Sequence, residues 1–161
     1  MSIADSSKTS KHLHTLYKKS KENYECAIKA QNVDCFNVAV SRLYYSALLM
    51  LKRCLIASGD YTEQDFLKPG AGSHVFIIDS YIQNLFPKLE GSYHYIMDIC
   101  YIRTLKDHRR DADYSPEIDY NASRTRKKFE ECIKSATKCL RAIELIHDIK
   151  ILNREEEDEK R

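Results

Sequence analysis

The sequence predicts an all-α protein, an up-and-down bundle of about five helices. Glycine (4) and proline (3) are scarce among the 161 residues, and these residue types supply many of the turns of β-rich folds. Hydrophobic residues make up 43% of the chain, enough to close one core. Apolar side chains also recur every three to four residues, the period of a helix with one buried face. The chain length suits a single domain.

The first two helices are expected at about 11–31 and about 35–58, after a polar, flexible leader at 1–10. Both helices carry an apolar stripe at helical spacing. Asn32 and Asp34 are good turn and N-cap residues between the two helices. Gly59 fits the position just after the second helix, because glycine adopts a positive φ without a steric penalty.

The next helices follow a predicted loop at 60–72 that contains Pro69 and two glycines. Ser73 can cap a third helix that stops at Pro87. A fourth helix is expected from 91 or 92 and should end between 108 and 111, because the sequence DADYSP follows. The last helix should begin near 115 or 119. The helical bundle is thus expected to span 11–152, with a frayed, charged tail at 153–161.

Composition narrows the possible functions. Twenty-six basic residues against 24 acidic ones give a net charge of +2, so a role with nucleic acid requires a local basic patch. The six cysteines form no CxxC pair and lie in apolar helical stretches, which favours reduced core cysteines over a zinc site. A signal sequence and an apolar run of roughly 20 residues are both missing, which favours a soluble, cytoplasmic protein away from membranes. No cofactor and no metal site is expected.

The segment 101–111, YIRTLKDHRRD, concentrates charged side chains around one histidine. Arg103 can hold a scissile phosphate, and His108 can exchange a proton with a 2′-hydroxyl or a leaving oxygen. Each function is worth on the order of a hundredfold in rate. The two residues share no face of a straight helix, but a loosening last turn would re-aim His108. Solvated surface charge is the alternative interpretation. Possible supporting residues in this segment are Thr104, Asp107, Arg109 and Arg110.

A second arginine–histidine pair, Arg141 and His147, has similar spacing inside the predicted last helix. We interpret that pair as a chance match, because a long helix should hold the two side chains apart. His74 and His94 each fall in a first helical turn, where we expect caps or surface residues rather than catalytic groups.

Aromatic and basic residues elsewhere offer further candidates for RNA binding. Tyr44 and Tyr45 are adjacent and must face different ways, so we expect Tyr44 in the core and Tyr45 near an interface. Tyr114 can stack a base or anchor a loop. A basic run can follow an RNA backbone, although a solvated helix face explains it equally. That run consists of Arg124, Arg126, Lys127 and Lys128.

Three stretches, taken in order, resemble the HEPN family. The segment 41–47, SRLYYSA, is similar to the family's second-helix signature. Arg103 and His108, with four residues between them, match its ribonuclease motif. Ala112-Asp113-Tyr114 and a long closing helix then follow in the family's usual order. The resemblance covers about 11–151. The sequence departs from the family pattern at Thr104, where a more strongly polar residue often follows the arginine.

The resemblance implies a homodimeric ribonuclease in which the motifs of two chains meet in one cleft. It also implies a toxin, antiviral-defence or RNA-processing role, often beside a nucleotidyltransferase-type antitoxin or other partner. We therefore expect a metal-independent endoribonuclease that leaves a 2′,3′-cyclic phosphate and a 5′-hydroxyl. Some family members lack activity, so the alternative is a non-catalytic module that binds a nucleotide or a partner protein. A plain helical assembly protein is the third interpretation.

Overall fold

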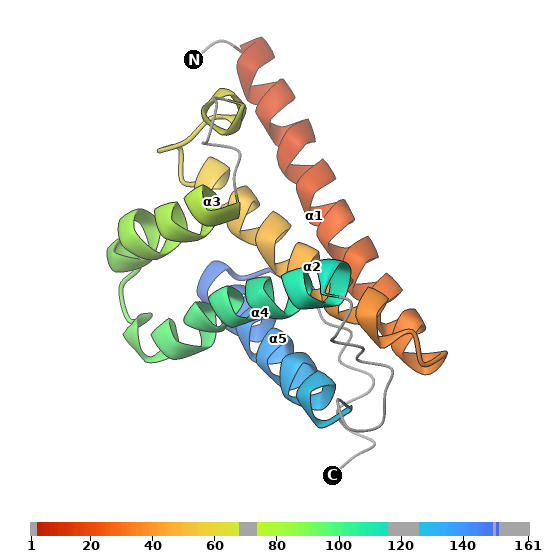
Figure 1. The fold of residues 1–161 in the computed structure, drawn as a ribbon. Helices are drawn as coiled ribbons and strands as arrows, with labels where there is room; N and C mark the ends of the chain where they lie inside the picture. The colour runs from red at the N-terminus through yellow and green to blue at the C-terminus, as the bar shows by residue number, and fades with distance from the viewer. Residues whose placement is uncertain (1–2, 68–73, 116–125, 150, 152–161) are drawn as a thin grey trace.

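The computed structural model describes residues 3–67, 74–115, 126–149 and 151. Over these residues the protein is an all-α bundle of five α-helices without a β-strand, which confirms the predicted fold class (Figure 1). The helices are α1 (Ile3–Asn32), α2 (Phe36–Ala57), α3 (His74–Ser80), α4 (Ile96–Tyr114) and α5 (Arg126–His147).

Helices α1 and α2 form an antiparallel hairpin joined by residues 33–35 (Figure 1). Prediction placed the N-cap of α2 at Asn32 or Asp34, but Cys35 occupies it without a side-chain cap. Asp34 instead takes a φ of 59°, the left-handed conformation that Asp tolerates better than most residues. The flexible leader was also wrong, because α1 already begins at Ile3. Residues 3–10 contain no glycine or proline, so nothing in them breaks the helix.

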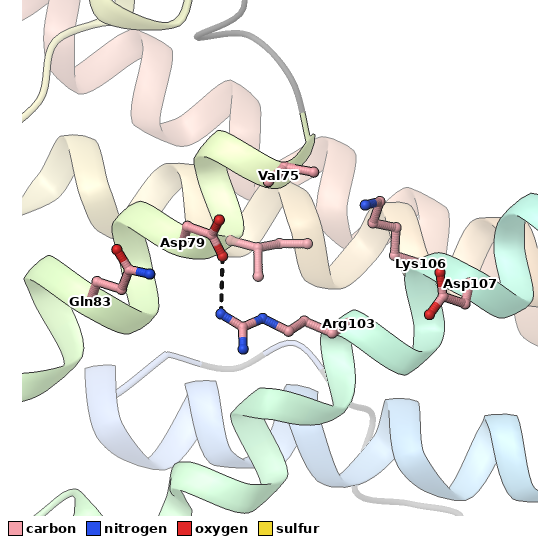
Figure 2. A pocket seen from close by; sticks show the side chains of 7 residues that line it. Val75, Asp79, Gln83, Arg103, Lys106 and Asp107 are labelled. Atoms are coloured by element: carbon pink, nitrogen blue, oxygen red, sulfur yellow. Dashed lines mark hydrogen bonds and ion pairs between the residues drawn. The ribbon is translucent and has the colours of Figure 1, made fainter.

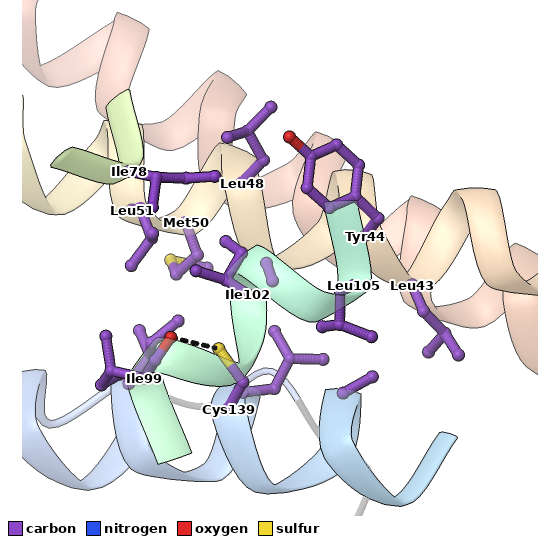
Figure 3. Packing of buried hydrophobic residues seen from close by; sticks show 14 of the residues in the cluster. Leu43, Tyr44, Leu48, Met50, Leu51, Ile78, Ile99, Ile102, Leu105 and Cys139 are labelled. Carbon is purple, nitrogen blue, oxygen red and sulfur yellow. Dashed lines mark hydrogen bonds between the residues drawn. The ribbon is translucent and has the colours of Figure 1, made fainter. Parts of the chain in front are cut away.

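Helix α2 is the centre of the bundle and contacts α1, α3, α4 and α5. Apolar side chains from α2, α3, α4 and α5 interdigitate around it (Figure 3). Tyr44 is fully buried there, as predicted. At the end of α2, Gly59 has a φ of 82° just after the C-cap Ser58, which confirms its predicted role. Burial of this apolar surface is the main stabilising term of such a bundle.

The connection from α2 to α4 contains more helix than predicted. A short 3₁₀ helix, η1 (Glu63–Phe66), lies inside the expected loop and begins at a capping box of Thr62 and Asp65. The predicted third helix is present but changes its winding, from α3 through a π-helical turn, η2 (Tyr81–Leu85), to a 3₁₀ turn, η3 (Phe86–Lys88). Another 3₁₀ turn, η4 (Tyr93–Tyr95), precedes α4. The predicted cap at residue 73 lies outside the described residues.

Helix α4 ends later than predicted. It runs past His108 to Tyr114, with Ser115 as its C-cap. Asp113, one of the aspartates expected to break it, instead supports its last turns, since Arg109 Nε lies 2.8 Å from Asp113 Oδ2 four residues later. Helix α5 is described from Arg126 onward, so the expected start at 115 or 119 falls outside the described residues. The predicted tail at 153–161 lies outside them as well.

The six cysteines are free thiols, but they do not share one environment. Cys54, Cys132 and Cys139 are buried core residues, as predicted. Cys139 Sγ lies 3.9 Å from the carbonyl oxygen of Ile99 and links α5 to α4 (Figure 3). Cys35 is exposed at the start of α2, so the prediction of a core cysteine was wrong there. It caps a helix at a chain reversal, which leaves its side chain outside the apolar stripe.

Candidate functional site

Arg103 and His108 lie on different faces of an unbroken helix. Five residues at about 100° each separate their side chains by roughly 140° around the helix axis. Arg103 points toward α3, where its Nη2 lies 3.0 Å from Asp79 Oδ1 (Figure 2). The expectation that the last turn loosens and re-aims His108 was therefore wrong, because α4 continues to Tyr114. Within one chain, the predicted pair does not form a site.

Arg103 borders a surface pocket of about 380 Å³ between α3 and α4. Its ion pair with Asp79 crosses this pocket, while Lys106 and Asp107 approach from the next turn of α4 (Figure 2). The pocket is lined by Val75, Ile78, Asp79, Gln83, Arg103, Lys106 and Asp107. Arg103 and Asp79 are both well exposed, so their ion pair adds little stability and can exchange for another partner.

His108 belongs to the opposite side of α4, beside α5. Burial lowers its pKa, with a smaller lowering from Lys128 and opposing contributions from Asp111, Asp107 and Glu131. Lys128 and Glu131 belong to α5, and their charges contribute to the pKa shift of His108. His108 is therefore placed near α5 rather than at the pocket beside α3. His108 and Arg103 therefore face different environments as well as different directions.

A denser cluster forms around Arg109, one residue further along α4. Its Nη2 donates a hydrogen bond to the hydroxyl of Tyr45 at 2.9 Å and a longer one to the hydroxyl of Tyr114 at 3.4 Å. The guanidinium carbon lies 5.3 Å from the ring centroid of Tyr45 and 5.1 Å from that of Tyr114, within cation–π range. The Nε contact with Asp113 is short but poorly angled, so it is an ion pair rather than a hydrogen bond.

His74, at the start of α3, joins the same cluster through two tyrosine rings of α2. Its ring centroid lies 5.6 Å from that of Tyr45, in a T-shaped arrangement, and 5.4 Å from that of Tyr44. Tyr45 therefore contacts both His74 and Arg109. We expected His74 to be a cap or a surface residue, but its ring is partly buried against α2.

The electrostatics of this cluster favour a neutral imidazole beside a charged guanidinium. Burial lowers the pKa of His74, and the nearby charges of Arg109 and Lys106 lower it further. Burial alone also lowers the pKa of Arg109, but Tyr114, Tyr45 and Asp113 raise it overall, so Arg109 stays charged. Neutral histidine can accept a proton, and charged arginine can hold an anion.

Tyr44 carries a buried hydroxyl in this cluster. The side chain has no exposed surface, and its hydroxyl has no hydrogen-bond partner among the described residues. Burial, together with the neighbouring Tyr45, raises the pKa of Tyr44 well above its usual value, so the hydroxyl keeps its proton. Buried polar groups without a hydrogen-bond partner are rare in folded proteins, and functional sites are one place where they occur.

The cluster brings together two of the stretches that carry the family resemblance. From the segment 41–47, Ser41 donates a hydrogen bond to Asp113 Oδ2 at 3.4 Å, and Tyr45 contacts Arg109. From the segment 112–114, Asp113 and Tyr114 both contact Arg109. The predicted RNA-binding residues Tyr45, Arg109 and Tyr114 therefore lie together, and Tyr114 leaves 69% of its surface exposed.

The other predicted site residues lie outside this cluster. Thr104 is exposed on α4, and Arg110 forms long ion contacts with Asp107 at 3.7 Å and Asp111 at 3.8 Å. Lys127 is exposed at the start of α5, whereas Arg124 falls outside the described residues.

The second arginine–histidine pair is divided between surface and interior. Arg141 is exposed, while the Nε2 of His147 shares a hydrogen bond of 2.7 Å with the hydroxyl of Tyr81. Burial, with a contribution from Arg53, lowers the pKa of His147 to about 4. This contact joins the end of α5 to η2, which supports the interpretation of Arg141 and His147 as a chance pair.

The protein is a small helical bundle in which an arginine, two tyrosines of α2 and a histidine cluster where α2, α3 and α4 meet. Comparison of the chain with protein-family models, curated proteins and solved structures finds no match. Among the described residues, no group of three or more histidine, cysteine, aspartate or glutamate side chains is placed to hold a metal ion. None of the described helices combines the length and apolarity needed to cross a bilayer.

Proposed function

We propose that the chain is a metal-independent endoribonuclease of the HEPN type, which cleaves RNA by attack of the 2′-hydroxyl. The observation that carries this proposal is the convergence of separate motif stretches around Arg109. Side chains from α2 and α4 surround one guanidinium beside the α3 imidazole of His74. A cation and an imidazole can support RNA cleavage without a metal, and an exposed aromatic ring can stack a base of the substrate.

Arg109 is the phosphate-binding group in this proposal. Its Nε contacts Asp113, and its Nη2 contacts Tyr45 and Tyr114. The two N–H groups of Nη1 can donate to one phosphate, and arginine suits this task because its planar donors match phosphate oxygens. Tyr114 is exposed enough to stack a base next to that phosphate.

Arg103 and His108 enter the same proposal as a pair contributed by two chains. Since α4 turns Arg103 toward α3 and His108 toward α5, the two side chains can meet only across an interface. The resemblance implies a homodimer with that arrangement. Arg109 is held by its own contact with Tyr45 of α2, so variants of Arg109 and variants of the Arg103–His108 pair can be tested independently.

The test is cleavage of RNA by pure protein in EDTA, with Arg109→Ala beside Arg141→Ala as the matched control. Wild type should release a 2′,3′-cyclic phosphate and a 5′-hydroxyl. Arg109→Ala should slow cleavage at least about a hundredfold, while Arg141→Ala, exposed on α5, should leave the rate unchanged. Circular dichroism should show the same helix content in both variants. A wild-type protein that cuts no RNA overturns the proposal.

The second candidate is a non-catalytic module that binds a nucleotide or a partner protein such as a nucleotidyltransferase. The divergence of Arg103 and His108 favours it, because a single chain does not bring together the residues of the ribonuclease motif. This candidate predicts that a single-stranded RNA oligonucleotide or a mononucleotide binds without cleavage and that Arg109→Ala weakens binding. Fluorescence anisotropy on the samples of the cleavage assay separates the two functions.

A further inference from the structure

We propose that the pocket between α3 and α4 binds the base of the nucleotide that carries the attacking 2′-hydroxyl, and that Asp79 makes the pocket selective for guanine. This inference rests on the proposed function and names the base at which RNA is cut. It keeps Arg103 and His108 as a pair contributed by two chains, because the pocket borders Arg103 of one chain. The pair carries out the chemistry, and the pocket selects the substrate.

Two helices form the walls of this pocket with the same residue spacing. The α3 wall consists of Val75, Ile78 and Asp79, and the α4 wall consists of Arg103, Lys106 and Asp107. Residues three and four positions apart share one face of a helix, and Figure 2 shows Asp79 and Arg103 reaching toward each other from these two faces. The volume of about 380 Å³ lies within the range of roughly 300–1,000 Å³ that small-molecule sites occupy. The pocket can therefore hold a group the size of a nucleobase.

Arg103 connects this pocket to the scissile bond. It is the member of the two-chain pair that is suited to contact the scissile phosphate, and it borders the pocket. The base and the 3′-phosphate of one nucleotide are joined through a single ribose. A phosphate on Arg103 therefore brings the base of the same nucleotide next to the pocket, and that nucleotide carries the attacking 2′-hydroxyl.

The ion pair of Arg103 and Asp79 provides partners for both parts of this nucleotide. Arg103 Nη2 donates a hydrogen bond of 3.0 Å to Asp79 Oδ1. Both side chains are well exposed, so water screens their attraction and the net energy of the pair is small. A phosphate can therefore replace Asp79 on Arg103. The released carboxylate then accepts hydrogen bonds from the N–H groups of a base in the pocket.

Guanine is the RNA base that matches these side chains. Its N1–H and its 2-amino group are adjacent donors, and the two oxygens of the Asp79 carboxylate can accept from both. Its O6 and N7 are acceptors that lysine commonly contacts, and Lys106 lines the pocket. Adenine and cytosine present a ring-nitrogen acceptor where guanine has N1–H, and uracil flanks its single N–H with two carbonyl oxygens. A carboxylate at this position therefore repels the other three bases.

DNA oligonucleotides that contain a single ribonucleotide test the inference, since attack by a 2′-hydroxyl can occur only at that position. In EDTA, the kcat/KM of wild type should be at least about tenfold higher at guanosine than at adenosine, cytidine or uridine. Asp79→Asn should lower kcat/KM at guanosine at least about tenfold, to the level of adenosine. Asp60→Asn is the matched control, because Asp60 forms an exposed ion pair with Lys88 elsewhere on the surface. This control should keep the preference for guanosine.

The outcomes separate this inference from the proposed function. If wild type cuts all four ribonucleotides equally fast, or Asp79→Asn keeps the preference for guanosine, the inference fails and the ribonuclease stands. If wild type cuts no RNA, the proposed function fails, and calorimetry with mononucleotides decides whether the pocket selects a base. Guanosine 3′-monophosphate should then bind wild type at least about tenfold more tightly than adenosine 3′-monophosphate. Equal affinities overturn the selection by Asp79.

A substrate analogue covers the case in which Asp79→Asn does not fold. Inosine is guanosine without the 2-amino group, so it lacks one of the two donors to Asp79. Wild type should cut an oligonucleotide with a single inosine ribonucleotide at least about fivefold more slowly than the guanosine substrate, because the carboxylate is left partly unpaired. Equal rates at inosine and guanosine contradict the proposed contact with Asp79.

Discussion

Tyrosine–histidine contacts join distant parts of this chain, and the contact of Tyr81 with His147 differs from that of Tyr45 with His74 in what surrounds it. In the interior, Tyr81 of η2 and His147 of α5 share a hydrogen bond of 2.7 Å. On the face formed by α2, α3 and α4, Tyr45 and His74 meet ring edge to ring face at a centroid distance of 5.6 Å. The first contact uses the polar atoms of both partners. In the second, the tyrosine hydroxyl accepts a hydrogen bond from Arg109 instead.

The difference separates a structural contact from a site that can bind a ligand. Tyr81 is fully buried, so its hydroxyl and the imidazole of His147 satisfy each other in the core. Beside the second contact, Arg109 hydrogen-bonds Tyr45 and also contacts the exposed Tyr114, and the charges of Arg109 and Lys106 lower the pKa of His74. The same two residue types therefore stabilise the bundle in one place and assemble a candidate site in the other.

The largest expected effect breaks the interior contact. Tyr81→Phe removes the hydroxyl and leaves the half-buried His147 without this hydrogen bond, which should lower the free energy of unfolding by about 1–3 kcal/mol. Urea unfolding followed by circular dichroism measures the change. RNA binding at the distant Arg109 face should stay as in wild type. An unchanged free energy of unfolding would mean that the contact does not stabilise the core.

The second expected effect is a loss of stability in acid. His147 has a pKa of about 4 in the folded protein and about 6.5 when unfolded. Because the unfolded state binds the proton more readily, stability is full above pH 6.5 and falls as the pH drops toward 4. Between pH 7 and pH 5 the loss from His147 should be about 2 kcal/mol. The lowered pKa of His74 acts in the same direction.

Urea unfolding at several pH values checks this acid effect, with His147→Gln as the control. Glutamine retains a hydrogen-bonding group but does not titrate, so the variant should lose most of the pH dependence between pH 7 and pH 5. Equal slopes in wild type and His147→Gln would assign the acid effect to other groups.

The smallest expected effect concerns Tyr44, which is fully buried like Tyr81 and lies beside Tyr45. Tyr44→Phe removes a hydroxyl that has no partner among the described residues, so the free energy of unfolding should change by less than about 0.5 kcal/mol. Tyr81→Phe, measured in parallel, is the matched variant with a bonded hydroxyl. A loss above about 1 kcal/mol for Tyr44→Phe would show that this hydroxyl has a partner in the folded protein.

The helices were predictable because their signals are local. The apolar stripe of α2 and the positive φ of Gly59 follow from spacing and residue type within a few turns. The predicted helix boundaries were wrong where a side-chain contact stabilises a helix that residue composition alone would end. Asp113 looked like part of a helix end, yet its ion pair with Arg109 supports the last turns of α4. That extension fixed His108 on a regular helix face.

The cluster was only partly predictable. Tyr45, Arg109 and Tyr114 were candidates from the sequence, but nothing in it showed that they meet, since 64 residues separate Tyr45 from Arg109. His74 gave no local signal at all, because its role depends on packing against α2. The spacing of Arg103 and His108 was visible in the sequence, whereas their divergence follows from the length of α4.

Complementation between inactive variants tests most directly whether Arg103 and His108 act as a pair contributed by two chains. Arg103→Ala and His108→Ala are mixed under conditions that allow subunits to exchange, and RNA cleavage is measured beside active wild type. The proposed function predicts recovery to roughly a quarter of the wild-type rate, because half of randomly mixed dimers would contain one intact site shared between two chains. A mixture that stays as slow as the separate variants, beside active wild type, would contradict the account.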